Sequence, residues 1–305
     1  MKYTTLGKSD LNASSIVLGC MRINNLNEKD LTRLINTSIE EGITLFDHAD
    51  IYGNGCCESI FGDVLKNNLE LRDKILLQSK CSIRNGFYDL SKNHILTSVD
   101  NSLNRLKTDY LDLLILHRPD TLMEPEEIAE AFTQLIDTGK VKNFGVSNFN
   151  SMQIELLKKY IDQPIIVNQL QFGIMHSEMV SNGIQVNTTF PGSVDRDGSI
   201  LEYSRLNNIT IQAWSPFQYG FFEGIFIDND KFPELNKTLA TIAEKYNVSK
   251  SAIAVAWIMR HPANMQTLIG TTKIDRVKDI CTATTINLSR EDWYTIYNAA
   301  GNILP

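Results

Sequence analysis

The sequence predicts an α/β protein in which eight parallel strands close into a (β/α)₈ barrel. Short apolar runs and amphipathic segments alternate along all 305 residues, a pattern typical of a parallel sheet covered by helices. Eight strand–helix units in a chain of this length favour a closed barrel over an open doubly wound sheet. No Gly-x-Gly-x-x-Gly motif follows the first predicted strand, which argues against the open alternative. Because no linker rich in Pro, Gly or Ser interrupts the pattern, residues 1–305 are predicted to form a single domain.

Strands are predicted where short apolar runs are bounded by polar or turn-forming residues. They are Ser15–Gly19, Ile43–Phe46, Ile75–Ser79, Tyr110–Leu116, Lys142–Ser147, Ile165–Asn168, Ile209–Ala213 and Thr267–Gly270. Helices are predicted where apolar residues recur on one face with the helical period. They are Asn27–Glu41, Glu58–Lys66, Ser91–Leu106, Glu126–Thr138, Ser151–Tyr160, Ile200–Leu206, Leu235–Tyr246, Lys250–Met259, Ile274–Ala283 and a C-terminal helix, Glu291–Ala300.

Residues that favour helix ends mark several of these boundaries. Asn27 is a suitable N-cap for the first helix, because its side chain can accept from a free backbone N–H. Gly42 closes that helix, and Ser91 has the N-cap role for the third. Pro125 suits a helix N-terminus, where its missing N–H costs nothing, and Gly139 ends the helix that follows.

One segment, Gln171–Gly198, departs from this rhythm. It contains several glycines and a proline and shows little periodicity. Loops of this length are uncommon inside a compact domain and are usually functional. The segment is a long loop after the sixth strand, so we expect it to hang over the active-site rim and to govern substrate range.

Composition excludes several classes of protein. The net charge of −7 and the isoelectric point near 5.3 argue against nucleic acid or an anionic membrane as a partner. No apolar run reaches the ~18 residues that span a bilayer, and residues 1–7 lack the apolar core of a signal peptide.

The five cysteines include no Cys-x-x-Cys pair, which is typical of free thiols in a reducing cytoplasm. Cys56 and Cys57 are interpreted as small residues at a helix start rather than as a redox pair.

Titratable residues follow three successive predicted strands. Asp47, Lys80 and His117 each close such a strand, and Tyr52 lies shortly after the first of them. The carboxyl ends of barrel strands meet at one rim, where barrel enzymes build their active sites. A tyrosine can donate a proton, and a nearby cation lowers its pKa. These four residues therefore predict the reduction of a carbonyl group.

A metal site is the main rival for such a rim. Barrel hydrolases often place His-x-His on the first strand and further ligands on later strands. The chain has five histidines and neither His-x-His nor His-Glu-x-x-His. We therefore expect no catalytic metal. His48 follows Asp47 and points to the opposite face if the strand continues, which favours a structural role.

Several motifs together resemble those of the aldo-keto reductase superfamily, and in particular bacterial reductases of the YdhF type. They are Phe46-Asp47-His48-Ala49-Asp50-Ile51-Tyr52-Gly53, Ser79-Lys80, Leu116-His117-Arg118-Pro119-Asp120 and Gly145-Val146-Ser147-Asn148-Phe149. The resemblance covers nearly the whole chain. It implies a (β/α)₈ barrel that binds NADPH without a Rossmann fold and reduces aldehydes or ketones.

The resemblance also implies a role for each catalytic residue. Tyr52 would protonate the carbonyl oxygen as hydride reaches the carbon. Lys80, held charged by Asp47, would lower the pKa of Tyr52. His117 would bond the substrate oxygen and orient it. The cofactor supplies the hydride, and the protein supplies position and electrostatics.

The same resemblance implies the NADPH/NADP⁺ contacts. Ser147, Asn148 and Gln169 would bind the nicotinamide carboxamide, and Trp214 would stack on its ring. The pyrophosphate would meet Ser215 and the backbone from Phe217 to Gly220. The 2′-phosphate would meet Gly270, Thr271, Thr272, Lys273 and Arg276 at a helix start.

Two departures and one alternative accompany this resemblance. Where the family commonly has Glu-Asn against the adenine, this chain has Asp279-Ile280, and only Asp279 can accept a hydrogen bond. After Gln169 the chain lacks the aromatic-His-Pro turn of many members.

The alternative function is a regulatory or redox-sensing NADP(H)-binding protein with little turnover, because some relatives of this fold are ion-channel subunits.

Overall fold

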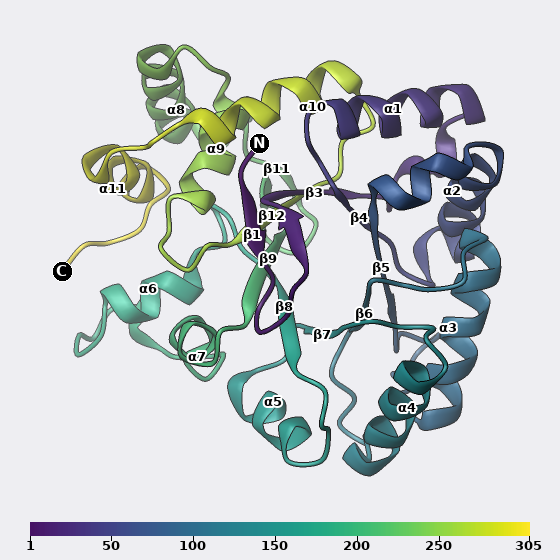
Figure 1. Cartoon of the computed structure of the whole chain (residues 1–305). Coiled ribbons are helices and arrows are strands. Elements are labelled where there is room, and N and C mark those ends of the chain that lie inside the picture. Colours follow the sequence, from purple (N-terminus) through teal and green to yellow (C-terminus); the bar gives the residue numbers. More distant parts are fainter.

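The computed structural model describes all 305 residues, and its centre is a closed barrel of eight parallel strands (Figure 1). The strands pair in the closed order β12-β3-β4-β5-β6-β7-β8-β9. They are β3 (Ile16–Gly19), β4 (Leu45–Asp47), β5 (Leu76–Cys81), β6 (Leu113–Leu116), β7 (Phe144–Ser147), β8 (Ile165–Gln171), β9 (Thr210–Trp214) and β12 (Gln266–Ile269). The predicted fold class is confirmed, and each barrel strand overlaps a predicted one.

Helices surround the barrel (Figure 1). They are α1 (Glu28–Glu40), α2 (Cys56–Asn67), α3 (Lys92–Leu106), α4 (Pro125–Asp137), α5 (Ser151–Lys158), α6 (Glu178–Ile184), α7 (Ile200–Asn207), α8 (Pro233–Tyr246), α9 (Lys250–Met259), α10 (Ile274–Cys281) and α11 (Arg290–Ala299). The predicted caps are confirmed: Asn27 accepts from the N–H of Asp30 at 2.9 Å, and Ser91 accepts from the N–H of His94 at 3.3 Å. The structure contains no helix that combines the length and the apolar character of a membrane span.

A small hairpin, β1 (Tyr3–Thr5) and β2 (Asn12–Ser14), covers the amino-terminal end of the barrel strands. Leu6 in its turn is fully buried. The N–H of Gly7 donates to the Thr210 hydroxyl at 2.9 Å. Gly7 has φ +53°, and a Cβ there would lie 2.6 Å from the backbone of Ile166, so this close approach requires glycine. The hairpin was not predicted from the sequence.

The segment Gln171–Gly198 does not cover the active-site rim. It forms α6 and a short 3₁₀ turn and packs against the C-terminal end of the chain. The Tyr297 hydroxyl donates to Ser181 at 2.9 Å, and the amide of Gln185 donates to the carbonyl of Ile303 at 3.1 Å. None of its residues lines the main cavity. The expectation that it hangs over the rim is therefore wrong.

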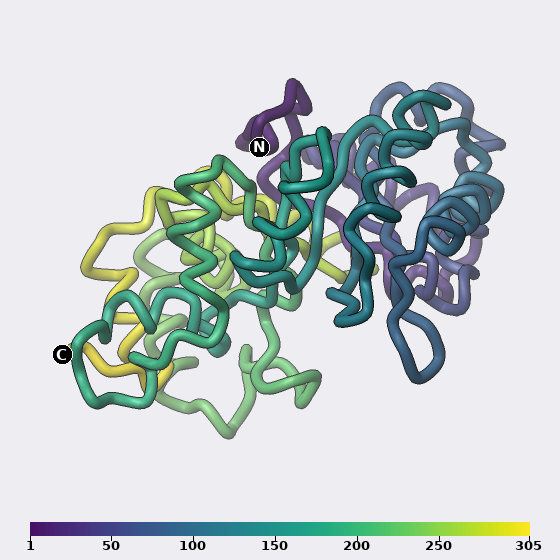
Figure 2. Tube along the Cα trace, turned by 90° about the horizontal axis from the view of Figure 1, so that it is seen from below, coloured from purple at the N-terminus to yellow at the C-terminus, as the bar shows by residue number.

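The segment after β9 takes that place. It carries the two-stranded hairpin β10 (Gln218–Tyr219) and β11 (Gly224–Ile225). Phe221 and Phe222 at its tip line the cavity. In Figure 2 this green segment projects from the body of the molecule.

Candidate active site

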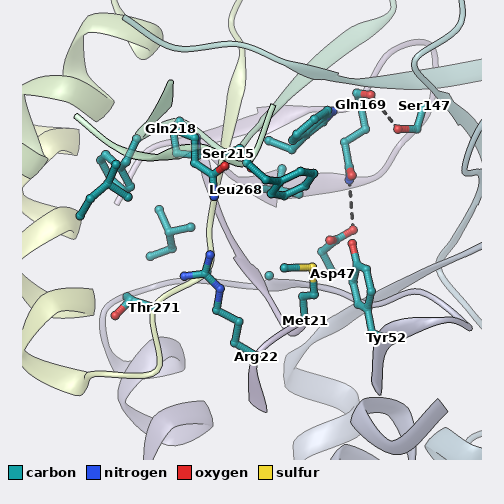
Figure 3. Close-up of a pocket in the computed structure, with 18 of the residues that line it drawn as sticks. Met21, Arg22, Asp47, Tyr52, Ser147, Gln169, Ser215, Gln218, Leu268 and Thr271 are labelled. Atoms are coloured by element: carbon teal, nitrogen blue, oxygen red, sulfur yellow. Dashed lines mark hydrogen bonds between the residues drawn. The ribbon is translucent and has the colours of Figure 1, made fainter. Parts of the chain in front are cut away.

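A cavity of about 860 Å³ lies at the carboxyl ends of the barrel strands (Figure 3). Its wall includes the final residues of five strands: Gly19, Asp47, Ser147, Trp214 and Ile269. Its volume is toward the upper end of the ~300–1,000 Å³ typical of small-molecule sites. The cavity therefore has room for a ligand of cofactor size.

Lys80 is the centre of a polar cluster that includes Asp47 and Tyr52 of the cavity wall. Its side chain is fully buried on β5, and its ammonium lies 2.7 Å from a carboxylate oxygen of Asp47. The ammonium also donates to the carbonyl of His48 at 2.8 Å and to the hydroxyl oxygen of Tyr52 at 3.1 Å. An ammonium has three N–H donors, so all three are occupied.

The turn after β4 presents Tyr52 to this ammonium. The N–H of Tyr52 donates to the carbonyl of Ala49 at 3.1 Å. The next three residues, Gly53, Asn54 and Gly55, have φ values of +57°, +55° and +87°. Glycine and asparagine adopt this left-handed region at low cost. The Gly-Asn-Gly sequence therefore allows the sharp turn that leaves Tyr52 in the cavity wall.

Burial and charge act in opposite directions on Tyr52. Burial raises the pKa of Tyr52, and the Lys80 ammonium lowers it, with a net rise above the ordinary value. Burial lowers the pKa of Lys80, but Asp47 and Tyr52 raise it more, so Lys80 stays charged. Lys80 acts on the pKa of Tyr52 in the predicted direction, but burial, which was not weighed in that prediction, outweighs it and makes the net pKa higher than usual. Tyr52 holds its proton at neutral pH, and because Lys80 donates to its oxygen, that proton is free to bond another acceptor.

His117 lies at the end of β6, edge-on to Tyr52, with ring centroids 6.1 Å apart. Loss of water lowers the pKa of His117 well below its usual value, and Lys80 and Arg118 lower it further. The imidazole is therefore neutral at physiological pH. A neutral imidazole donates one hydrogen bond, which suits the oxygen of a carbonyl held between His117 and Tyr52.

A network of glutamines beneath the rim holds Asp47, and this network was not predicted from the sequence. The amides of Gln78 and Gln169 donate to Asp47, the latter at 3.0 Å. Gln212 accepts from both of those amides and donates to Gln266 at 2.9 Å. Gln78 precedes Lys80 by two residues on one strand, so the alternation of side chains places both on the inner face. That spacing is the signal that could have identified it.

The residues predicted at the nicotinamide form a connected group in the cavity wall. The Ser147 hydroxyl donates to the carbonyl of Gln169 at 2.8 Å, a contact drawn in Figure 3. The Asn148 amide donates to Ser147 at 2.8 Å, and the indole N–H of Trp214 donates to Asn148 at 3.2 Å. Phe222 stacks on Trp214 with ring centroids 6.0 Å apart. The two protons of the Gln169 side-chain amide are donated to Asp47 and Gln212. Only the side-chain carbonyl oxygen of Gln169 is therefore available to a ligand.

The residues predicted at the phosphates are only partly in the cavity wall. The wall contains Ser215, Phe217, Gly270, Thr271, Thr272, Lys273 and Arg276. It lacks Gly220, whose carbonyl accepts from Gln171 at 3.2 Å. It also lacks Asp279, which accepts from the Ser249 hydroxyl at 2.5 Å. Ile280 is fully buried in the core, so its apolar side chain is explained by packing.

Two further cations in the wall were not predicted as ligand-binding residues. Arg22 follows β3, and Figure 3 shows its guanidinium extending into the cavity. Arg118 follows His117. Both come after barrel strands, so the rule that selected Asp47 and Lys80 could have selected them. The wall thus contains Arg22, Arg118, Lys273 and Arg276, none of which forms an ion pair within the chain.

The family of the chain follows from its sequence match. The model of the "Aldo/keto reductase family" matches residues 15–300. The chain belongs to this family. The family makes the chain an oxidoreductase of the carbonyl-reducing class, and members generally use NAD(P)H.

Similar proteins extend over almost the whole of this aldo/keto reductase. "Uncharacterized oxidoreductase YcsN" of Bacillus subtilis is 35% identical, over 95% of each chain. "Oxidoreductase YdhF" of Escherichia coli is 34% identical, over 94% of this chain and 93% of its own. "6-dehydroglucose reductase" of Agrobacterium fabrum is 32% identical, over 95% of each. The structure of a thermostable aldo-keto reductase, Tm1743, bound to the inhibitor epalrestat, is similar with a TM-score of 0.79 and 25% identity, covering 98% of this chain and 100% of that one.

Several chemically active side chains of this aldo/keto reductase lie outside the cavity wall. His48 is fully buried edge-on to Phe61, with ring centroids 4.6 Å apart. Burial lowers its pKa to about 3, which agrees with the structural role predicted for it. All five cysteines are free, and neither Cys56 nor Cys57 lines the cavity. No group of three or more His, Cys, Asp or Glu side chains is placed to share a metal ion.

Proposed function

We propose that this aldo/keto reductase uses NADPH to reduce aldehydes or ketones to alcohols, with Tyr52 as the general acid. One observation carries the proposal: the buried Lys80 ammonium is shared between the Asp47 carboxylate and the Tyr52 hydroxyl in the cavity wall. Burial keeps the proton on Tyr52, and the Lys80 ammonium places a positive charge where a tyrosinate would form.

The chain's own residues then have distinct tasks. A bound nicotinamide cofactor supplies the hydride. Tyr52 transfers its proton to the carbonyl oxygen, and Lys80 stabilises the tyrosinate that remains. Asp47 keeps Lys80 charged. His117 donates a hydrogen bond to the substrate oxygen, which stabilises the negative charge that develops there.

The cavity wall suits a phosphorylated dinucleotide. The hydroxyl and amide groups of Ser147 and Asn148 and the carbonyl oxygen of Gln169 offer partners for a carboxamide. At the other end, Lys273 and Arg276 lie at the start of α10, where backbone N–H groups also favour an anion. Arg22 adds a third cation on this side. These unpaired charges support NADPH rather than NADH, because the 2′-phosphate carries roughly two negative charges.

Steady-state oxidation of NADPH in the presence of a panel of small aldehydes and ketones tests the proposal. We expect turnover with several of them and alcohol formed in equal amount to the NADPH consumed. Tight NADPH binding with no turnover of any carbonyl compound would instead favour a regulatory protein.

A further inference from the structure

We propose that Arg118 forms a carboxylate-binding subsite beside the catalytic residues, so that preferred substrates carry a carboxylate as well as the reactive carbonyl. This inference rests on the proposed function and adds the substrate class. Arg118 immediately follows His117 and lines the same cavity. Its guanidinium carbon lies 6.0 Å from the ring centroid of Trp214. It also contributes to the lowered pKa of His117. Arg118 is therefore near the place where a carbonyl would meet Tyr52 and His117.

Hydrogen bonds hold the backbone of Arg118 in place, whereas its guanidinium has no hydrogen-bond or ion-pair partner. Its N–H donates to the Ser82 hydroxyl oxygen at 3.0 Å, and that hydroxyl donates to its carbonyl at 3.2 Å. Ser82 is fully buried. The guanidinium, in contrast, forms no hydrogen bond or ion pair. Arginine offers a planar set of donors that matches a carboxylate bidentately, and here the whole set is available.

No nearby acid neutralises this charge. Asp120, two residues further on, accepts from the N–H groups of Leu90 and Leu122 at 3.3 and 2.9 Å. The acids in the cavity wall are also engaged, Asp47 with Lys80 and Asp228 with Lys250. The chain has 36 acidic and 29 basic side chains. An arginine that is half-buried and unpaired in so acidic a protein indicates an anionic ligand.

The other free cations of the cavity have a separate assignment. Lys273, Arg276 and Arg22 are accounted for by the phosphates of the proposed cofactor. Arg118 instead follows His117 directly in the chain, and its guanidinium carbon lies 6.0 Å from the Trp214 ring centroid. A single guanidinium matches the single charge of a carboxylate, whereas a phosphate monoester carries roughly two charges. Ile83, Tyr88 and Phe222 in the nearby wall suit an apolar spacer between the two groups.

A matched substrate pair tests the subsite: 4-carboxybenzaldehyde, which is anionic at neutral pH, and 4-formylbenzamide, which has the same shape without the charge. A charge-assisted hydrogen bond contributes about 1.5–3 kcal/mol, which corresponds to about 10- to 100-fold in affinity. We expect Arg118→Met to lower kcat/KM for the acid by about this factor, mainly through KM. The amide should change less than about threefold, and Arg118→Lys should retain part of the preference.

Arg84→Met is the matched control, because Arg84 is exposed on the neighbouring loop and does not line the cavity. It should leave both substrates unchanged. The dissociation constant of NADPH, measured for each variant, should also stay unchanged and confirms folding. Equal losses for acid and amide in Arg118→Met, or weakened NADPH binding, would overturn the subsite. Failure of the unmodified protein to reduce either aldehyde or any of the wider panel would instead count against the proposed function.

Discussion

The two ends of the cavity differ in how their charges are satisfied. At the catalytic end Lys80 uses all three donors, and Asp47 accepts from Lys80 and from two glutamine amides. At the other end Lys273 and Arg276 are exposed and form no ion pair within the chain. The first arrangement needs little reorganisation during a reaction, whereas the second is completed only by an anionic ligand. Substitutions of Asp47, Tyr52 or Lys80 should therefore change turnover, and those of Lys273 or Arg276 should change cofactor affinity.

The largest expected effect tests the catalytic end. Tyr52→Phe removes the proton donor and keeps the ring. Because loss of a general acid typically costs about 10²–10⁴-fold, kcat should fall by that range. NADPH affinity, measured by quenching of tryptophan fluorescence, should remain nearly unchanged. A variant that keeps more than about a tenth of kcat would remove Tyr52 from this role.

The next effect tests the opposite end. Lys273→Ala with Arg276→Ala removes two cations facing the predicted 2′-phosphate. Charge-assisted hydrogen bonds contribute about 1.5–3 kcal/mol each, so NADPH affinity should fall by roughly 10²-fold or more. NADH affinity should change little, and the rate at saturating cofactor should be largely retained. Added salt should weaken NADPH binding more than NADH binding. Equal affinities of the unmodified protein for the two cofactors would contradict this assignment.

A smaller effect concerns stability and pH. Burial lowers the pKa of His48 to about 3, below its unfolded value of about 6.5. The folded protein therefore binds fewer protons at this residue than the unfolded chain, and stability decreases as the pH falls below 6.5. Between pH 7 and pH 5 this corresponds to about 2 kcal/mol. In urea unfolding, the free energy of unfolding of His48→Leu should decrease less than that of the unmodified protein over this pH range. If the free energy of unfolding of both proteins depends on pH in the same way, His48 is not the source of that dependence.

The smallest expected effect is that of metal removal. Tyr52, Lys80 and His117 together supply a proton and stabilise negative charge, so the proposed reaction requires no Lewis acid. Prolonged dialysis against a chelator should leave activity unchanged. Activity that disappears and returns with Zn²⁺ would support a metal-dependent mechanism.

The sequence predicted those features that depend on local pattern. The alternation of strands and helices predicted the barrel, and the ends of β4, β5 and β6 predicted that Asp47, Lys80 and His117 converge. The position of Gln171–Gly198 could not be predicted, because it depends on contacts with residues near position 300. The net pKa of Tyr52 depends on burial, which local pattern does not reveal. Gln78, Gln212 and Gln266 are uncharged residues within strands, so a search for titratable residues at strand ends does not select them.

The fate of the transferred hydride distinguishes carbonyl reduction with Tyr52 as the acid from any other use of the cavity. NADPH labelled with deuterium at the transferred position of C4 would be incubated with the protein and 4-carboxybenzaldehyde, and the alcohol analysed by mass spectrometry. We expect the alcohol to gain deuterium at its carbinol carbon and the label to resist exchange with water. Tyr52→Phe should form very little labelled product. Unlabelled alcohol, or equal amounts of labelled alcohol from both proteins, would contradict the proposed mechanism.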